Sequence, residues 1–391
     1  MTLRVDIETI FRFRKSDGPQ STVVLLDFLK EIRDTGKLTR AARQSSLSYR
    51  HAWNLVTRWS DFFGVPLVRR QKGKGSVLTP FGEKLVWAGQ RMQARLGPQL
   101  ENLSQELTSE LNPFLPGTPS VIRVHASHGF AVPRLREILN RTPGMTVDLR
   151  YVGNQNSLVA LSHDECDLAG LHLPRGPSRA KHAAAGREWL DPRIHCVVGL
   201  VARQMGLMVK RGNPLNIGSL EDLLRPDIRF VNREPHSGTR EVFETLLGQQ
   251  GIEPGAIPGY ERIEFTHAAV AAYVASGMAD VAFGVEAAAR QFGLDFIHLV
   301  TEDYFFVCKK SLLETAPMKR ILDVMRGEEF HQAIAVLPGY AAVETGVIKS
   351  VEETFEGKTA NKTADKTARR KPALILKRTA ARSRLRRSGR G

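Results

Sequence analysis

The residues best suited to holding a small anion lie in one short segment, between positions 232 and 240. Ser237 and Thr239 flank a glycine and are expected to open a helix, which would place two hydroxyl groups and several backbone N–H groups at its positive end. Arg233 precedes this turn and Arg240 follows it. Ser-Gly-Thr is also a common helix cap, and Arg240 can pair with Glu244 one turn along the helix. The segment therefore predicts an anion site only in combination with other polar residues.

Such residues follow the ends of several predicted strands, which is where open α/β sheets bind their ligands. His172 and His267 are among them, although a histidine of this kind is more often a structural residue than a ligand-binding one. Together these residues predict a pocket for a small anionic or polar ligand. The candidate ligand-binding residues are Ser127, His128, Asn154, Asn156, Ser157, His172, Arg233, Ser237, Gly238, Thr239, Arg240 and His267.

A second group of residues is suited to contacting nucleic acid. A helix is expected to begin at Tyr49 behind the cap Ser48, and its apolar residues recur at i, i+3, i+4 and i+7 from Ala52 to Trp59. Its opposite face is polar and could reach base edges and phosphates in a major groove; an ordinary surface helix is the alternative. With an expected helix cap at position 39 and a basic loop after the helix, the candidate DNA-binding residues are Thr39, Ser48, Tyr49, Arg50, His51, Asn54, Arg58, Arg70, Lys72 and Lys74.

The elements around this helix complete a small domain. An amphipathic helix is expected over residues 22–34, and residues 3–14 alternate apolar and polar side chains, as an extra strand would. The helix from Tyr49 ends at residues 64–66, and residues 67–79 then read as two short strands joined by a tip rich in glycine and lysine. Lysines on such a tip suit DNA phosphates, so we expect a wing beside the helix-turn-helix.

A long helix follows the wing. Thr79 and Pro80 are expected to cap and open it, and residues 81–111 carry leucines near the spacing of a coiled-coil seam. Gly97 and Pro98 lie inside the helix and predict a kink or break there. The helix could pair two chains or pack on its own domain. Proline and glycine between residues 112 and 119 then predict a linker.

From residue 120 onward, strands and helices alternate, which predicts an α/β region with mainly parallel sheets. The expected strands cover residues 121–126, 146–152, 166–173, 200–209, 228–232, 261–265, 280–283 and 295–309. The expected helices cover residues 133–140, 156–161, 220–224, 239–250, 267–276, 286–292, 318–325 and 327–337.

The N-terminal motifs resemble those of LysR-type regulators, and most closely the molybdate-responsive ModE branch. The matching motifs are an Ala-Ala pair at residue 41, S-Y-R-x-A-W from Ser48, G-V-P-L-V-x-R from Gly64 and L-T-P-F-G-E-K-L from Leu78. They cover roughly residues 21–88. The resemblance implies a winged helix that binds operator DNA, and a long helix that joins two such domains. The wing tip is shorter than we expect of that branch.

The C-terminal region resembles the two-lobed type II periplasmic-binding-protein fold over about residues 118–350. Asp167-Leu168-Ala169 and Asp280-Val281-Ala282 each open a short buried strand after a helix, one in each lobe, and the chain is expected to cross between lobes near Ala202 and to return near Asp303. R-x-x-x-S-G-T-R from Arg233 resembles the oxyanion loop of tungstate- and molybdate-binding proteins. The effector implied is molybdate, tungstate or a small carboxylate, since the nearby arginines and histidines also suit a carboxylate.

These observations predict four segments in an α/β chain. They are a winged helix-turn-helix domain (residues 1–80), a dimerisation helix with its linker (81–117), a PBP-like domain (118–355) and a disordered basic tail (356–391). Lobe one is expected at about 118–201 and 304–355, and lobe two at about 202–303. The predicted function is a cytoplasmic transcription regulator, a homodimer or homotetramer, that binds double-stranded DNA and a small-molecule effector. The alternative is a solute-binding or molybdenum-cofactor-related module with only non-specific DNA binding.

Composition narrows the remaining possibilities. The net charge is +15, and residues 358–391 contain 13 of the 56 lysines and arginines but one of the 41 acids. The basic character therefore belongs to the tail, which could attract DNA without sequence preference or have no dedicated role. Three cysteines with no metal-ligand spacing predict reduced, buried thiols and no metal site. No signal peptide, membrane span, catalytic motif or cofactor motif is expected, which disfavours an enzyme.

Overall fold

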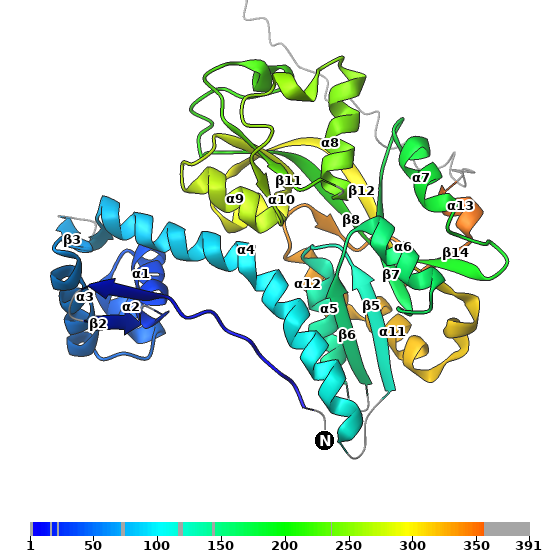
Figure 1. The fold of residues 1–391 in the computed structure, drawn as a ribbon, viewed down its shortest axis with the longest axis horizontal. Helices are drawn as coiled ribbons and strands as arrows, with labels where there is room; N and C mark the ends of the chain where they lie inside the picture. Colours follow the sequence, from blue (N-terminus) through cyan, green and yellow to red (C-terminus); the bar gives the residue numbers. More distant parts are fainter. Residues whose placement is uncertain are drawn as a thin grey trace, which may run out of the picture.

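The computed structural model describes residues 3–15, 18–21, 23–71, 75–115, 120–142, 145–235 and 237–355. Within these ranges the chain forms a small N-terminal domain, a long helix and a large two-lobed domain (Figure 1). The predicted wing lysines Lys72 and Lys74, most of the predicted linker and the predicted basic tail lie outside the described residues. No described helix has both the length and the apolar content that crossing a bilayer requires.

The N-terminal domain, called the head below, is a winged helix-turn-helix. It contains β1 (Arg12–Lys15), β2 (Gly18–Ser21), α1 (Val23–Thr35), α2 (Leu38–Gln44), α3 (Tyr49–Phe63), β3 (Val68–Gln71) and β4 (Gly75–Leu78). As predicted, the Ser48 side chain caps α3 by accepting a hydrogen bond from the His51 N–H, and Gly64 ends the helix in the left-handed region at φ 73°. The antiparallel pair β3–β4 confirms the two strands of the wing. The expectation that Thr39 caps α2 is wrong, because α2 begins at Leu38 and its N-cap position is Lys37.

The extra strand predicted over residues 3–14 is largely wrong. Only Arg12–Lys15 pair, with Gly18–Ser21, while residues 3–11 form an extended strap with no strand partner. The strap is fixed instead by side chains of the long helix. The backbone N–H groups of Leu3, Val5 and Ile7 donate to Asn112 Oδ1, Thr108 Oγ1 and Ser104 Oγ at 2.9, 3.0 and 3.1 Å. Polar residues spaced by four on one helix face therefore give the strap its register.

This register predicts that the strap opens when its acceptors are removed. Ser104→Ala and Thr108→Val should each remove one hydrogen bond worth about 0.5–1.5 kcal/mol, and they should speed hydrogen exchange at the Ile7 and Val5 amides. Glu106→Ala, at an exposed position of the same helix, is the matched control. Unchanged exchange at both amides would show that the side chains do not hold the strap.

The long helix α4 (Pro80–Leu111) is continuous. Thr79 caps it and Pro80 opens it, as predicted. Pro98 does not break the helix, but Figure 1 shows α4 changing direction about midway between the head and its C-terminal end. The apolar residues of the predicted coiled-coil seam fall into two groups that differ in burial. Met92, Leu96 and Leu100 are half-buried, whereas the residues beyond them are exposed: Leu103, Leu107 and Leu111.

The large domain is built on a ten-stranded sheet that two long strands divide into lobes. Strand β8 (His195–Val209) pairs antiparallel with β12 (Asp295–Lys309) along almost its full length. On one side of this pair lie the strands of lobe one, β5 (Ser120–Ala126), β6 (Met145–Tyr151) and β7 (Leu168–Pro174). On the other side lie those of lobe two, β9 (Phe230–Arg233), β10 (Ile263–Glu264) and β11 (Val281–Val285). Ala202 lies opposite Asp303 in the ladder, where the sequence predicted that the chain crosses between lobes.

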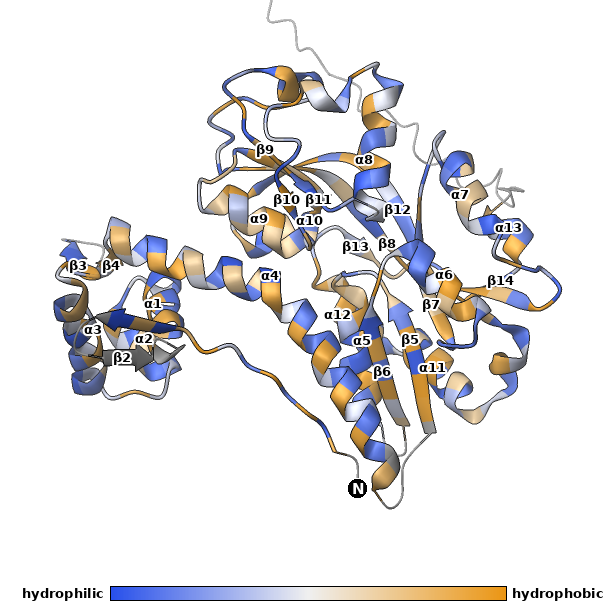
Figure 2. Cartoon of the chain, viewed as in Figure 1, coloured by the Kyte–Doolittle hydropathy of each residue, from blue (hydrophilic) through white to orange (hydrophobic). Residues whose placement is uncertain are grey.

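Helices cover both lobes, and the strands between them are mostly hydrophobic (Figure 2). In lobe one, α5 (Ala131–Asn140), α11 (Ala316–Arg326) and α12 (Glu328–Ala335) pack on one side, and α6 (Asn154–Ser162), α7 (Arg179–Arg187) and α13 (Val351–Phe355) surround a separate hydrophobic cluster. In lobe two, α8 (Gly238–Gln249), α9 (His267–Ala275) and α10 (Glu286–Gln291) pack on the main core. Sequence analysis missed α7, α13 and the short strands β13 (Tyr340–Ala341) and β14 (Ile348–Lys349).

The expectation of mainly parallel sheets needs correction. The outer strands of each lobe pair in parallel, but β8 and β12 pair antiparallel with all their neighbours in the sheet. Both strands are much longer than the others because they serve both lobes. They also bring Cys196 and Cys308, which are free and buried, to an Sγ–Sγ distance of 3.6 Å.

Candidate functional site

A cavity of about 370 Å³ lies where the two lobes meet. Its lining comes from the C-terminal ends of strands β5 and β6, from the middle of β7 and β8, and from the N-terminal ends of α8 and α9. The lining residues are Ser127, His128, Tyr151, Val152, Gly153, Asn156, His172, Arg203, Arg233, Glu234, Pro235, Ser237, Gly238, Thr239 and His267. A volume in this range suits a small organic molecule or an oxyanion with several waters.

The floor of the cavity holds a buried ion pair that sequence analysis missed. The Arg203 Nε donates to Glu302 Oε2 at 2.8 Å, and Arg203 and Glu302 are 1% and 0% exposed. Burial opposes both charges, but the pairing outweighs it and holds the pKa of Glu302 at about 2. Arg203 Nη1 and Nη2 have no hydrogen bond of good geometry with the described residues, although the Tyr340 hydroxyl interacts with Arg203 both electrostatically and as a weak hydrogen-bond partner. Glu302 therefore occupies only one edge of the guanidinium.

A second buried guanidinium lines the same cavity from lobe two. Arg233 is 5% exposed, and its Nη2 donates to the Phe265 carbonyl at 2.7 Å. Its Nε and Nη1 have no acceptor among the described residues. Burial lowers the pKa of Arg233 to about 10, with the nearby Glu234 raising it and Arg203 lowering it further, so the group stays charged at neutral pH. Buried donors without acceptors are costly, and an anionic ligand would satisfy them.

The histidines of the cavity are neutral at physiological pH. Burial, then the positive charge of Arg233, lower the pKa of His128 to about 3, and burial holds the pKa of His267 well below its usual value. Burial also lowers the pKa of His172 despite Glu302 at 3.2 Å from its Nδ1. Because Glu302 is ionised, Nδ1 carries the proton of His172 and Nε2 is an acceptor. Among the described lining residues, the positive charge of the cavity therefore comes from Arg203 and Arg233.

The predicted anion turn is present but its hydroxyl groups already have partners. Ser237 Oγ donates to the Glu234 carbonyl and accepts from the Arg240 N–H, and Thr239 Oγ1 lies 3.4 Å from His267 Nε2. Gly238 begins α8, and a Cβ atom there would lie 2.4 Å from Cε1 of His172. The start of a lobe-two helix thus touches a lobe-one strand, and only glycine fits between them.

The structure brings most of the predicted ligand-binding residues to one cavity. Those that line it are Ser127, His128, Asn156, His172, Arg233, Ser237, Gly238, Thr239 and His267. Three predicted residues do not line it. Arg240 pairs with Glu244 at 2.8 Å, the structural alternative, while Ser157 is fully buried with its hydroxyl on the Gly153 carbonyl, and Asn154 donates to the His172 carbonyl.

Two of the residues missed by sequence analysis, Arg203 and Glu302, lie inside strands, away from the strand ends that were searched. Arg203 and Glu302 are directly opposite each other in the β8–β12 ladder. For Arg203, a single arginine in the middle of a long apolar strand is the signal that could have identified it. Tyr151, which stacks on His128 with ring centroids 4.4 Å apart, is the last residue of β6.

The head presents a polar, basic face built by α3 and the wing. Ala52, Val56 and Trp59 are buried and Leu55 is half-buried, as the apolar spacing predicted. The remaining predicted contacts on α3 are exposed: Tyr49, Arg50, His51, Asn54 and Arg58. Arg70 of β3 lies over the ring of the exposed Trp53 at 5.7 Å, which ties the wing to this face. Sequence analysis did not include Trp53 among the candidate contacts, and Thr39 is exposed on the first turn of α2.

Comparison with known families matches two separate parts of the chain. Residues 24–83 match the bacterial regulatory helix-turn-helix proteins of the lysR family, and residues 135–326 match the PBP superfamily domain. The first match covers the helix-turn-helix, the wing and the start of α4. The second covers most of both lobes and all of the cavity's arginines.

Individual relatives match one part of the chain each. The uncharacterized protein YvgK of Bacillus subtilis is 34% identical over 199 residues, which is 51% of this chain and 64% of YvgK. An uncharacterized protein of Clostridium pasteurianum, from the 5′ region of a ferredoxin gene, is 40% identical over 99 residues, 25% of this chain and 88% of that protein. The molybdenum-pterin-binding protein MopB of Rhodobacter capsulatus is 35% identical over 83 residues, 20% of this chain and 31% of MopB. The chain thus spans less than two thirds of YvgK.

Among solved structures, the LysR family transcriptional regulator CbnR covers 77% of this chain and 98% of its own, at 18% identity and a TM-score of 0.36. An OxyR mutant of Corynebacterium glutamicum covers 79% of this chain and 92% of its own, at 15% identity and a TM-score of 0.40.

Proposed function

Because this chain belongs to the LysR-type regulators, with a lysR-family helix-turn-helix domain and a PBP superfamily domain, we propose that it binds operator DNA and changes that binding when an anion occupies the cavity between its lobes. The observation that carries the ligand half of the proposal is the pair of buried guanidiniums, Arg203 and Arg233, each of which has two nitrogens without a hydrogen-bond acceptor among the described residues. The proposal places the protein in the cytoplasm, where its DNA is.

The DNA half of the proposal rests on α3 and the wing. An exposed helix capped at Ser48 presents arginine, histidine, asparagine and tyrosine on one face, opposite the face that packs on the head. These side chains suit hydrogen bonds to base edges and phosphates, with the wing placed to contact the adjacent backbone. The exposed leucines 103, 107 and 111 of α4 support a homodimer, in which two heads would meet successive major grooves.

We expect Arg50→Ala and Asn54→Ala each to weaken binding to the operator by about 1–3 kcal/mol, because both side chains are exposed on the face proposed to read bases. Binding to a shuffled duplex should change much less. Fluorescence anisotropy with both duplexes at one salt concentration measures the effect, and Glu106→Ala on α4 is the control. Equal operator affinity in both variants would remove these two residues from the interface.

The chemistry of the cavity favours a carboxylate-bearing ligand over molybdate or tungstate. Selective oxyanion sites of the molybdate type use neutral hydroxyl and amide donors, and here the hydroxyls of Ser237 and Thr239 already face protein groups. The unpaired buried groups of the cavity include four guanidinium nitrogens, two on Arg203 and two on Arg233, and guanidinium N–H groups match a planar carboxylate in pairs. The cavity volume of about 370 Å³ also exceeds what a five-atom oxyanion needs.

A thermal-shift screen tests this preference. The panel is molybdate, tungstate, sulfate, formate, succinate and citrate, each added to the full chain at equal ionic strength. A carboxylate at 100 times its dissociation constant should add about 2.7 kcal/mol of stability. Stabilisation by molybdate and tungstate alone would show that the cavity prefers these oxyanions to carboxylates, and it would still support an anion site between the lobes. No stabilisation by any anion, together with unchanged operator binding, would contradict the proposed ligand response.

A further inference from the structure

Helix α4 is fastened to both lobes, and its first half holds lobe two. The Lys84 Nζ donates to the Ser276 carbonyl at 3.2 Å, and Arg95 Nε lies 3.6 Å from a carboxylate oxygen of the buried Glu264. Arg91 lies over the ring of Tyr273, with its guanidinium carbon 5.5 Å from the ring centroid. These contacts come from successive turns of α4 and reach the strand and helix that frame one side of lobe two.

The second half of α4 holds lobe one. Asn102 forms two hydrogen bonds with the backbone of Tyr151, donating to its carbonyl at 3.1 Å and accepting from its N–H at 2.8 Å. Glu101 pairs with Arg136 of α5, and Ser109 donates to Asp148 of β6 at 2.9 Å. Tyr151 is both the anchor for Asn102 and part of the cavity lining.

The bend of α4 lies between these two sets of contacts. Pro98 has no N–H, so the carbonyl four residues earlier, that of Ala94, lacks its helical donor. Thr266 Oγ1 donates to this carbonyl at 3.0 Å. Thr266 is also the N-cap of α9, whose first residue, His267, lines the ligand cavity. The Ala94 carbonyl, which the proline leaves without a helical donor, therefore attaches α4 to α9, the helix whose first residue lines the ligand cavity.

The bend also forms the wall of a second hollow that adjoins the ligand cavity. This hollow, of about 300 Å³, is lined by Ala94, Pro98 and Glu101 of α4 together with residues of both lobes. It shares His128, Tyr151 and His267 with the ligand cavity. The midpoint of α4 thus faces the place where the two lobes meet, with space beneath it in which the lobes can move.

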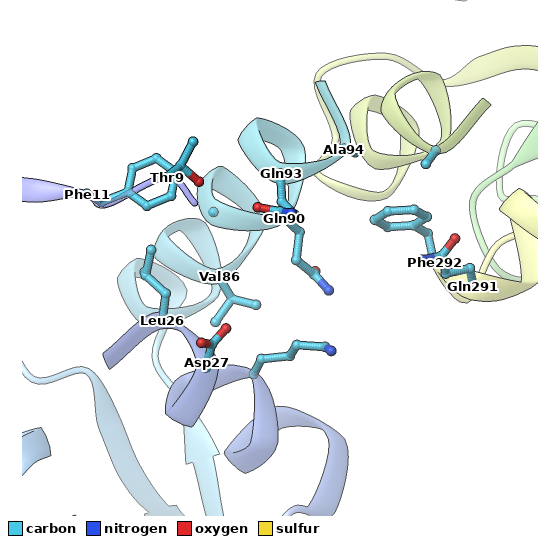
Figure 3. Close-up of a pocket in the computed structure, with 13 residues that line it drawn as sticks. Thr9, Phe11, Leu26, Asp27, Val86, Gln90, Gln93, Ala94, Gln291 and Phe292 are labelled. Atoms are coloured by element: carbon cyan, nitrogen blue, oxygen red, sulfur yellow. The ribbon is translucent and has the colours of Figure 1, made fainter. Parts of the chain in front are cut away.

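A third hollow lies between the head and lobe two, and it shares Ala94, Ala268 and Gln291 with the second hollow. Figure 3 shows Leu26 and Asp27 of α1 and Val86 of α4 on one side, and Gln291 and Phe292 at the end of α10 on the other. Its volume is about 310 Å³. The head thus faces lobe two across a hollow that runs along the first half of α4.

We propose that α4 is the element that converts lobe closure into a change of head direction, through its bend at Gly97–Pro98. Each half of the helix moves with one lobe, so a change in the angle between lobes must change the bend, and the head continues the first half. The further step, that the new head direction changes DNA binding, rests on the proposed function. The mechanical coupling between the lobes and the head does not depend on it. Thr266 and Asn102 are the positioning residues of this device.

The test opens the lobes without any ligand. Gly238→Phe places a ring where a Cβ atom alone would lie 2.4 Å from His172, so it should hold the lobes apart. Gly248→Phe is the matched control, because it adds the same side chain to the exposed end of α8, where no atom lies within 4 Å of an added Cβ. If Gly238→Phe does not fold, Gly238→Ala carries the same test, since its methyl group meets the same atom.

Two distances are measured by double electron–electron resonance on the full chain, with labelled chains diluted into unlabelled ones. Labels at Lys181 and Gln249 report the angle between lobes, and labels at Thr57 and Glu106 report the head relative to the second half of α4. All four positions are exposed. We expect Gly238→Phe to shift both distributions beyond the width of the wild type, and Gly248→Phe to shift neither. Adding Asn102→Ala to the Gly238→Phe chain should preserve the first shift and remove the second.

A shift between lobes with no shift between Thr57 and Glu106 would overturn the proposal. An unchanged distance between lobes in Gly238→Phe would also overturn the proposal. The proposal assumes that the two lobes close onto each other where Gly238 meets His172, so a bulky side chain at that point must separate them. A chain that shows both shifts but no operator preference would keep the coupling and contradict only the proposed function.

Discussion

Replacing Arg203 by methionine is expected to destabilise the two-lobed domain by about 3–5 kcal/mol, because the change leaves the carboxylate of Glu302 buried without its counter-charge. Methionine fills a similar volume, so little of the effect should come from a cavity. The double variant Arg203→Met, Glu302→Gln should regain most of the loss, since a neutral amide can still bond to His172. Urea unfolding of the full chain, followed by circular dichroism, measures both. A double variant no more stable than Arg203→Met would show that packing, and not charge, explains the loss.

The same pair predicts how stability depends on pH. In the wild-type chain the pKa of Glu302 is about 2, below the usual value of a glutamate, so the pair stabilises the fold at neutral pH and this contribution is lost as the pH falls from about 4 toward 2. In Arg203→Met the buried carboxyl lacks its partner, and its pKa should instead lie above the usual value. The stability difference between the two proteins should therefore be largest at neutral pH and shrink on acidification.

Replacing Arg233 by methionine is expected to act in the opposite way, weakening ligand binding without lowering stability. Arg233 is buried, and its Nε and Nη1 have no acceptor among the described residues, so its charge is a cost to the empty protein. When an anion binds, the same groups should form charge-assisted hydrogen bonds, and their loss should weaken binding by about 2–5 kcal/mol, at least about 30-fold in Kd.

Calorimetry with the anion that gave the largest thermal shift measures this effect. Arg240→Met is the matched control, because Arg240 is seven residues away and pairs with Glu244 outside the cavity lining. Operator binding of the ligand-free Arg233→Met protein should equal that of the wild type. A Kd for the anion within threefold of the wild type would mean that the ligand does not reach Arg233.

The head could be predicted closely because its signals are local. The cap at Ser48, the apolar spacing from Ala52 to Trp59 and the glycine after Phe63 each depend on neighbouring residues, and the structure confirms all three. The strap over residues 3–11 could not be predicted in the same way. Its alternating pattern is that of a strand, but its partners are side chains about 100 residues away, and no local pattern encodes them.

The cavity shows the same division between local and distant signals. Residues at strand ends and helix starts, such as His128 and Gly238, could be predicted as ligand-binding residues from their place next to an expected strand or helix. Arg203 and Glu302 were missed because they lie in different strands about 100 residues apart, and only the register of β8 against β12 brings them together. The attachment of α4 to lobe two includes a hydrogen bond from Thr266 to a carbonyl 172 positions earlier, which no sequence spacing reveals.

The most direct test of the account compares two duplexes. The full chain is titrated against a fragment of its own promoter and against a shuffled duplex of the same length and composition, at one moderate salt concentration. The account predicts binding to the promoter fragment at least about a thousandfold tighter, with the difference reduced by Arg50→Ala. Equal affinity for the two duplexes would contradict the central claim, whatever anion the lobes bind.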